Sequence, residues 1–373
     1  MSTPLATALP NARATFRDWL AARDRAGRLV VFCHFDADGL AAGALFGRGL
    51  PRLGFENVEV VPSGRSENAF YTESAKERLR AHDPGGLLVT DLGVNEAGVL
   101  DGVPTLYVDH HRPEGLPEGA VVSGYGWDPI PCSAWLAYDL LAAETDVDDL
   151  LWVAAVGVLS DLGDKAPWPR LADAKKRYTA KWLKEAVVLT NAARRASEFD
   201  PETPLRLLLT GDGPKALSDG PGSDKLARYR KEVAAELAEA RKAAPVFSER
   251  DPDVPSGVAP DRLRFALVRL DSPCQVHPLI AQQWRGRLPK YPVIAANTGY
   301  RPGRVSFSTR TARDEVKLPA IYQAVDLGPE HAQHDDDYGH GHDAASGGSL
   351  PPAAFNRLLD RLGFSPDAYV PDP

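Results

Sequence analysis

Short apolar runs alternate with helix-like segments from Arg28 to about Gly124. The runs are rich in Val and Leu and lack polar alternation, which is typical of parallel strands that are covered on both faces. In chain order the stretches read RLVVFCHF, GLAAGALFGRGL, VEVVPSG, YTESAKERLRAH, GLLVTDLG, NEAGVL, TLYVDHH and GAVVSGYG. The pattern therefore predicts an α/β domain built on a parallel sheet.

Helical periodicity dominates the next part of the chain. Residues 133–144, 148–164 and 173–198 predict three helices, the last of them amphipathic. Ser133 and Asp148 or Asp149 are candidate N-terminal caps. Residues 201–223 concentrate Pro and Gly and predict a connection, and a further helix should continue to about Ala244.

The C-terminal part alternates strands and helices on a smaller scale. RFALVRLDS, YPVIAANTG and RVSFSTRT predict strands, LIAQQWRGRL predicts a helix, and a final helix carries Phe355, Leu358, Leu359 and Leu362 at helical spacing. The expected organisation is a parallel-sheet N-terminal domain over 13–200, a linker with a helix over 201–250, and a mixed α/β C-terminal domain over 251–366. The fold class is α/β.

Composition agrees with a folded, soluble protein. Hydrophobic residues make up 43% and charged residues 25% of 373 positions. The chain lacks both an apolar run of membrane length and a signal-like start, so we expect a cytoplasmic protein with no membrane partner. The cysteines (Cys33, Cys132 and Cys274) lie far apart, which argues against a disulfide framework. A net charge of −8 disfavours nonspecific binding to long nucleic acid but not a nucleotide substrate.

Residues able to bind a metal follow the predicted strands of the first domain. An isolated D-x-D pair is more often a solvated acidic turn, but the carboxyl ends of parallel strands meet at one edge of a sheet. Asp161, which follows the apolar helical segment WVAAVGVLS, could supply another carboxylate from across that edge. The candidates are His34, Asp36, Asp38, Asp91, Asp109, His110, His111 and Asp161. This mixture of imidazoles and carboxylates suits a divalent ion such as manganese better than a thiolate-bound metal.

Four stretches in this order resemble the motifs of the DHH phosphoesterases. They are HFDADG (34–39), VTDLG (89–93), DHH (109–111) and GVLSDLGD (157–164), and the first looks more like the branch that contains the RecJ exonucleases than the oligoribonuclease branch. The resemblance implies a pair of Mn²⁺ ions, with Mg²⁺ or Co²⁺ as substitutes. These ions would polarise the phosphoryl group and generate hydroxide near neutral pH.

The resemblance also implies a role for each motif residue. Asp91 would bridge the ions, with His34 and Asp36 on one side and Asp38, His110 and Asp161 on the other. His111 would contact the scissile phosphate, and Asp109 would orient His110.

A second polar tract, HAQHDDDYGHGHDAASGGSL, occupies residues 331–350. It could form a separate metal site, but its glycines favour close approach of the backbone to a ligand, ahead of a final helix whose N-terminus attracts anions. The tract resembles the glycine-rich GGGH-type motif of the DHH-associated C-terminal domain, although His340 stands where a glycine is usual. The substrate-binding residues implied by this resemblance are Arg310, Gly341, His342, Gly347 and Gly348.

These features favour a manganese-dependent phosphodiesterase that hydrolyses short oligonucleotides (nanoRNA) or linear or cyclic dinucleotides to mononucleotides. The alternative enzyme is a RecJ-like single-strand exonuclease, which would need a long basic track and stacking aromatics. We find no long basic stripe and expect no added OB-fold after the second domain. A pyrophosphatase and a catalytically inactive scaffold are further alternatives. The sequence does not show whether the substrate is DNA or RNA, from which end it is attacked, or whether the protein forms a homodimer.

Overall fold

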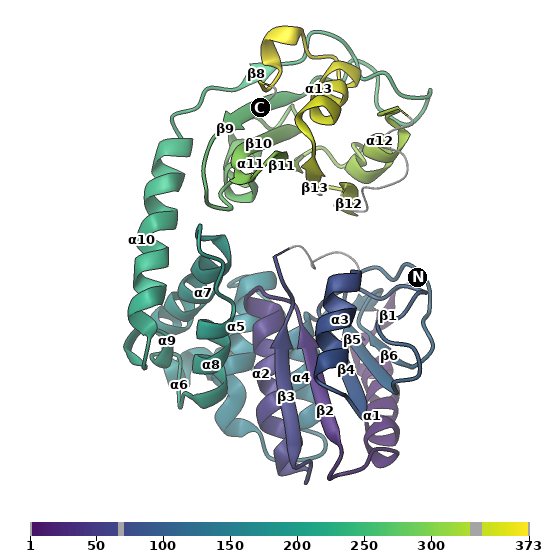
Figure 1. Ribbon diagram of the computed structural model, residues 1–373, viewed down its shortest axis with the longest axis vertical. Coiled ribbons are helices and arrows are strands. Elements are labelled where there is room, and N and C mark those ends of the chain that lie inside the picture. Colours follow the sequence, from purple (N-terminus) through teal and green to yellow (C-terminus); the bar gives the residue numbers. More distant parts are fainter. Residues whose placement is uncertain (1, 66–70, 329–337, 372–373) are drawn as a thin grey trace. The chain divides into compact units, whose positions relative to one another are not determined.

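The computed structural model describes residues 2–65, 71–328 and 338–371. Contacts divide the chain into two compact units, drawn in Figure 1. Unit 1 contains residues 1–194 and 198–230, and unit 2 contains residues 195–197 and 231–373. The boundary therefore falls inside helix α10 (Ser223–Ala240).

Unit 1 is built on a five-stranded parallel sheet with the order β3-β2-β4-β5-β6. The parallel sheet expected from the unbroken apolar runs is confirmed. Its strands are β2 (Arg28–Cys33), β3 (Asn57–Pro62), β4 (Gly86–Thr90), β5 (Thr105–Asp109) and β6 (Ala120–Ser123). The three central strands are buried almost throughout, as expected for a sheet that is covered on both faces.

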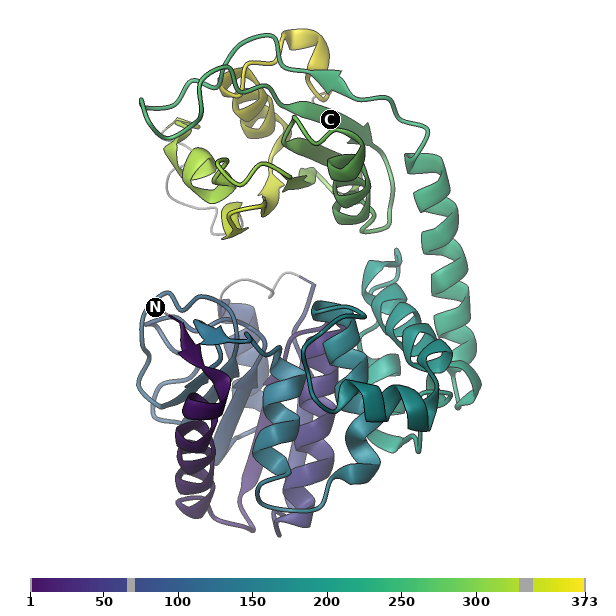
Figure 2. The same cartoon turned by 180° about the vertical axis from the view of Figure 1, so that it is seen from behind.

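Helices cover both faces of this sheet (Figure 1 and Figure 2). On one face, Leu79 from α3 packs in a cluster with Phe32 and Val89 from the strands. On the other face, α2, α4 and α5 pack against one another, and their residues are almost all buried. The bounds are α2 (Ala37–Arg52), α3 (Glu73–Ala81), α4 (Ser133–Leu141) and α5 (Leu151–Asp161).

The helix expected over NEAGVL does not form. Residues 95–100 are turns between β4 and β5, and Gly98 and Gly102 have positive φ angles of 65° and 74°. Val99 and Leu100 are nevertheless buried in the cluster beside α3. The apolar pattern therefore marked burial correctly, while the glycines permitted a compact turn in place of a helix.

The helical region after the sheet is more divided than the sequence suggested. Thr179, with a φ of 63°, separates α6 (Leu171–Tyr178) from α7 (Ala180–Arg195). The stretch over 201–223 contains α8 (Glu202–Thr210) and α9 (Ala216–Asp219), and α8 packs on α2. Apart from Pro204, which lies in the first turn of α8, the Pro and Gly residues flank these short helices, and their density made the stretch read as a connection. The remaining elements of unit 1 are β1 (Thr3–Pro4), α1 (Leu5–Ala21), β7 (Trp127–Asp128) and the 3₁₀ turn Asp148–Leu150.

Unit 2 has a six-stranded mixed sheet with the order β12-β13-β11-β10-β9-β8. Strands β9 and β10 pair in parallel, and the other neighbours among the described strands pair antiparallel. The strands are β8 (Val246–Phe247), β9 (Ala266–Leu270), β10 (Val293–Arg301), β11 (Arg304–Arg310), β12 (Tyr338–His342) and β13 (Ala345–Leu350). The helices are α11 (His277–Arg287), α12 (Leu318–Ala324), α13 (Pro352–Arg361) and the 3₁₀ turn Pro366–Ala368. The expected mixed α/β domain is confirmed.

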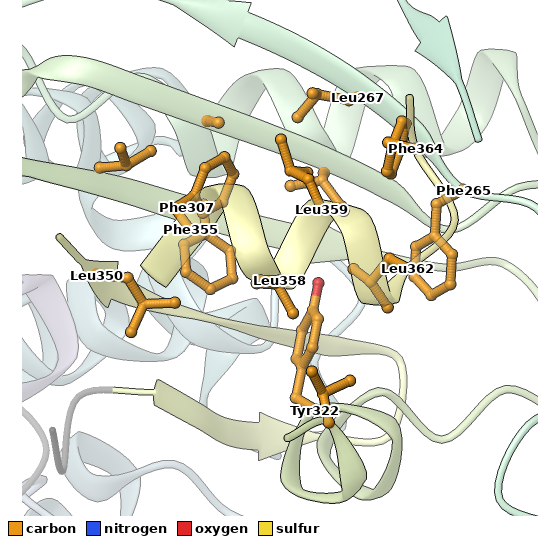
Figure 3. Close-up of a cluster of buried hydrophobic side chains, with 14 of the residues drawn as sticks. Phe265, Leu267, Phe307, Tyr322, Leu350, Phe355, Leu358, Leu359, Leu362 and Phe364 are labelled. Carbon is orange, nitrogen blue, oxygen red and sulfur yellow. The ribbon is translucent and has the colours of Figure 1, made fainter. Parts of the chain in front are cut away.

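One face of this second sheet carries the main core of unit 2. Figure 3 shows Phe355 and Leu359 of α13 among side chains from the sheet, with Tyr322 of α12 nearby. The rings of Phe355 and Phe307 lie 5.2 Å apart between centroids, and Phe355 is fully buried. Successive side chains of β11 point to alternating faces of the sheet, so residues 306, 308 and 310 point to the face opposite Phe307.

Replacing Phe355 with alanine tests the importance of this core. We expect Phe355→Ala to lower the free energy of unfolding by about 3–5 kcal/mol, because it removes a buried ring and leaves a cavity. Urea denaturation followed by circular dichroism measures the change. The matched control is Phe247→Ala at a side chain that is 44% exposed, and we expect a loss below about 1 kcal/mol. Equal losses in the two variants would contradict this assignment of the core.

Candidate metal centre

The candidate ligands converge at the carboxyl edge of the parallel sheet. His34, Asp91 and His110 each follow directly on the last residue of β2, β4 and β5. From β2 the chain first adds β3 on one side and then β4 on the other. In open α/β sheets, this reversal of direction marks the place where ligands bind.

The first motif is divided between a strand end and a helix. His34, Asp36 and Asp38 occupy every second position, so on an extended strand they would share one face. This prediction is wrong, because β2 ends at Cys33 and α2 begins at Ala37. Asp36 is the N-cap of α2, and its carboxylate accepts hydrogen bonds from the amides of Asp38 (3.2 Å) and Gly39 (3.1 Å). The sharp change of direction still brings all three side chains to the same edge.

Among the described residues, three groups of three possible ligands form at this edge; one of them, Asp91, His110 and His111, overlaps with the other two, which share no residue. Of these two, the first is His34, Asp36 and Asp91, and the second is Asp38, His110 and Asp161, with the ligand atoms of each group within 4.8 Å of one another. Asp91 also lies near the second group, with its Oδ1 3.4 Å from His110 Nε2. Its Oδ2 is 3.8 Å from His34 Nδ1. The carboxylate of Asp91 therefore extends between the two groups.

The backbone of Asp91 adopts a conformation that side chains rarely take. Its φ is 65°, in the left-handed region, and its amide donates to the carbonyl of Val108 on the adjacent strand. Such a conformation costs about 1–3 kcal/mol unless the surroundings impose it. In this turn it directs a buried carboxylate back over the end of the sheet.

Asp109 pairs with His111. Its Oδ1 lies 2.9 Å from His111 Nδ1 and accepts a 2.7 Å hydrogen bond from the amide of His111, while its Oδ2 accepts from the amide of Gly93. The expectation that Asp109 orients His110 is therefore replaced by a direct contact with His111. Burial opposes the charge on both groups, but their hydrogen bond lowers the pKa of Asp109 and raises the pKa of His111.

The first turn of α4 contributes contacts that the sequence did not reveal. Ser133 Oγ donates to Asp91 Oδ1 (2.8 Å), and the amides of Ser133 and Ala134 donate to the two oxygens of Asp38 (2.8 and 3.0 Å). Ser133 was expected to cap this helix, but the cap position is Cys132. A serine close to the start of a helix has a common structural explanation, so nothing in the sequence connects it with the acidic residues.

The carboxylates differ in how readily they ionise. Burial, followed by the nearby Asp91 and Asp161, raises the pKa of Asp38 well above its usual range. Burial and Asp36 similarly raise the pKa of Asp91. Asp36 is half-buried, and although burial opposes its charge, the nearby His34 and Arg194 lower its pKa. Close carboxylates repel one another when ionised, and a cation between them removes this cost.

The donor set fits a hard or borderline divalent ion. The two groups that share no residue offer two imidazoles and four carboxylates, the overlapping group adds the imidazole of His111, and no cysteine belongs to any of the three. Asp38 and Asp91 are 2% and 4% exposed, so water only weakly screens their charges. A divalent ion would find here the negative charge and oxygen ligands that it needs.

Unit 2 brings together two of its predicted binding residues. Arg310 pairs with Ala345, and Ala345 pairs with His342, so the three residues form one row across β11, β13 and β12. Paired residues point to the same face of a sheet, and this face is opposite the Phe355 core. His342 and Arg310 therefore share a face.

The glycines of this hairpin have structural reasons to be glycine. A Cβ on Gly341, whose φ is 123°, would lie 2.4 Å from the carbonyl oxygen of Ala345, and one on Gly347 would lie 2.4 Å from that of Phe307. Gly347 and Gly348 were expected to lead directly into the final helix, but they lie within β13. Residues 331–337, the first part of the proposed second metal tract, lie outside the described residues.

Arg310 lies on the sheet face without a compensating charge. Within residues 2–65, 71–328 and 338–371, its guanidinium has neither a hydrogen-bond acceptor nor an ion-pair partner. Burial and the nearby Arg285 lower the pKa of Arg310. A partly buried cation beside a second cation favours an incoming anion, and the guanidinium fork matches phosphate geometry.

Comparisons with known proteins agree with these motifs. The chain is 30% identical over 231 residues to the single-stranded-DNA-specific exonuclease RecJ of Thermus thermophilus. Its fold is similar to that of an exonuclease RecJ bound to manganese (TM-score 0.65, 22% identity, covering 97% of this chain and 95% of that one). It also matches the DHH domain of a protein described as a member of a family of ribosomal proteins (TM-score 0.64, 15% identity, 97% and 92% covered).

The chain therefore resembles RecJ in part of its sequence and shares the fold of these two structures. The sequence match covers 51% of this chain and 34% of the curated RecJ, so the chain spans about a third of the length of that relative. No family model matches the chain. Among the described residues, no helix is both long and apolar enough to cross a membrane.

A glycine of α5 allows this helix to pack closely on the start of α4 and on Asp38. A Cβ on Gly157 would lie 2.3 Å from Ala134 Cβ and 2.7 Å from Asp38 Oδ1. We expect Gly157→Ala to lower the free energy of unfolding by about 1–3 kcal/mol and to weaken Mn²⁺ binding, because α4 and Asp38 must move apart. Urea denaturation and calorimetric titration with Mn²⁺ measure the two effects.

Gly286→Ala is the matched control for this substitution. Gly286 also lies in a helix, and a Cβ there meets nothing within 4 Å. We expect unchanged metal binding and equal or slightly higher stability. Native Mn²⁺ affinity in the Gly157→Ala protein would contradict the expected displacement of Asp38.

Proposed function

We propose that this chain is a metal-dependent phosphodiesterase that hydrolyses short oligonucleotides or dinucleotides to mononucleotides. The observation that carries the proposal is the pair of ligand groups joined by Asp91. His34, Asp36 and Asp91 would hold one Mn²⁺ ion, and Asp38, His110, Asp161 and Asp91 would hold the other. Bound ions would supply Lewis-acid polarisation of the phosphoryl oxygens and water activation near neutral pH.

The residues of this chain would orient the substrate around that chemistry. His111, fixed by its contact with Asp109, would donate a hydrogen bond to the scissile phosphate or to the charge that develops on it. Asp109 would keep the His111 ring in place and in its protonated form. Asp91 would hold the two ligand groups at a fixed separation through its position at the end of β4.

We assign the two units different parts of the reaction. Unit 1 would carry hydrolysis, and unit 2 would bind the nucleotide through the face that carries Arg310 and His342. Gly341, Gly347 and Gly348 would serve this binding indirectly, by shaping the hairpin that presents His342. A uniform charge track for a long strand is not needed in this scheme, in agreement with the net charge of −8.

Single-strand exonuclease activity is the second candidate. It is favoured by the 30% identity to a protein named as a single-stranded-DNA-specific exonuclease. A ladder of labelled DNA and RNA strands from dinucleotides upward, together with cyclic dinucleotides, separates the two candidates. Turnover that is highest for dimers supports the short-substrate proposal, and turnover that rises with length supports the exonuclease. Each substrate is tested with Mn²⁺ and separately with Mg²⁺.

Asp91→Ala tests the shared ligand. We expect a loss of at least about 10³-fold in kcat at saturating Mn²⁺, because both ligand groups lose the same carboxylate. The assay is steady-state hydrolysis of a dinucleotide at controlled metal concentration. The control is Asp101→Ala, which removes an exposed carboxylate of the same unit and should retain activity. Full turnover by a folded Asp91→Ala protein would refute the mechanism.

Arg310→Ala tests substrate binding by unit 2. We expect KM to rise about tenfold or more with a smaller change in kcat, because a phosphate contact of the ground state is lost. Arg313→Ala is the control, since Arg313 is already paired with Glu315 at 2.8 Å. An unchanged KM in the Arg310→Ala protein would remove this residue from the proposed binding face.

A further inference from the structure

The start of α4 contacts the carboxylates of both ligand groups at once. Ser133 Oγ donates to Asp91, which lies in the first group and extends toward the second. The amides of Ser133 and Ala134 donate to Asp38 of the second group. Two consecutive residues thus provide three hydrogen bonds to two candidate ligands, each between 2.8 and 3.0 Å.

These hydrogen bonds are buried, and burial strengthens their effect on the carboxylates. Ser133 is fully buried, and its two acceptors are 2% and 4% exposed. Water therefore competes weakly, and donors that point at an ionised carboxylate stabilise it against the repulsion of its neighbours. The α4 helix also directs the positive end of its dipole toward Asp38.

The contacts fix orientation as well as charge. Both oxygens of Asp38 accept backbone hydrogen bonds, so the plane of this carboxylate is set by the first turn of α4. Asp91 receives its bond through Oδ1, the oxygen that lies 3.4 Å from His110 Nε2. A rotation of the Asp91 carboxylate would break the bond to Ser133. The Ser133 hydroxyl therefore favours one orientation of the Asp91 carboxylate, which lies between the two ligand groups.

We propose that Ser133 is a positioning residue of the metal centre, whose hydroxyl holds Asp91 in the orientation that serves both ligand groups. This inference rests on the proposed function only in assuming that the two ligand groups bind divalent ions. Ser133 would not touch the metal or the substrate, and it would act through Asp91. Partners of this kind typically change metal affinity by about 10- to 100-fold when removed.

Ser133→Ala separates the hydroxyl from the two backbone contacts. Both amides remain to bind Asp38, and only the donor to Asp91 is lost. We expect the dissociation constant for Mn²⁺ to rise about 10-fold or more. The measurement uses the full chain and Mn²⁺ alone: electron paramagnetic resonance counts the free ion, and calorimetry gives the affinity. Thermal melting in a chelator and in excess Mn²⁺ reports stability separately.

Two further variants make the result specific. Ser133→Thr keeps a hydroxyl, and we expect it to restore Mn²⁺ affinity to within about threefold of the original. Thr190→Val removes a hydroxyl of α7 that is also fully buried but has no hydrogen-bond partner among the described residues, and we expect unchanged affinity. If Ser133→Ala does not fold, Ser133→Cys takes its place, because a thiol is a much weaker donor of similar size.

The outcomes are distinct. Weakened Mn²⁺ binding in Ser133→Ala, with rescue by threonine, supports the proposal. Native Mn²⁺ affinity in Ser133→Ala, with the same loss of melting temperature in chelator and in Mn²⁺, overturns it and leaves Ser133 a purely structural residue. If the original protein binds Mn²⁺ but cleaves no phosphodiester, the proposed function fails while the binding test of Ser133 still decides its role.

Discussion

Repulsion among buried carboxylates is the constraint on which the metal centre depends. Asp38 and Asp91 lie close together with almost no access to water, and both resist ionisation in the absence of a cation. A fold that keeps such groups together must either neutralise them or provide donors and a cation. This chain provides the donors through the first turns of two helices, at the amides after Asp36 and at the start of α4. The remaining charge fits a divalent ion.

The parallel sheet supplies the geometry for this arrangement. Three neighbouring strands end at the same level, and each is followed immediately by a potential ligand. Helices α2, α4 and α5 pack closely enough behind them that a single methyl group at Gly157 would reach both Ala134 and Asp38. The core and the centre are therefore not independent, since the same helix packing that buries apolar surface also fixes the donors.

The sequence predicted the parallel sheet, the mixed C-terminal fold and the grouping of the motif residues because each depends on a regular pattern. Unbroken Val and Leu runs end in His34, Asp91 and Asp109 or the residues after them, and strand ends in a parallel sheet converge. The local conformation of the backbone could not be predicted in this way. The break at Thr179, the turns in place of a helix near Gly98 and the β12–β13 hairpin depend on long-range packing that overrides local preference.

The side-chain contacts within the candidate metal centre also could not be predicted from the sequence. Asp109 is adjacent to both His110 and His111, and only the three-dimensional turn decides that it contacts His111. Ser133 lies 42 residues from Asp91 along the chain, so no spacing rule connects them. In unit 2, the glycines implied that the backbone closely approaches another group but did not show which one, and the close contacts are between neighbouring strands of the same sheet.

The left-handed turn at Asp91 has a consequence for protein engineering. The position of this carboxylate is set by an unusual main-chain conformation as well as by its side chain. Copying the acidic and imidazole residues onto another parallel sheet would therefore not reproduce the centre unless the host loop adopted the same conformation at that residue. A successful graft would have to transplant the turn with its supporting strand.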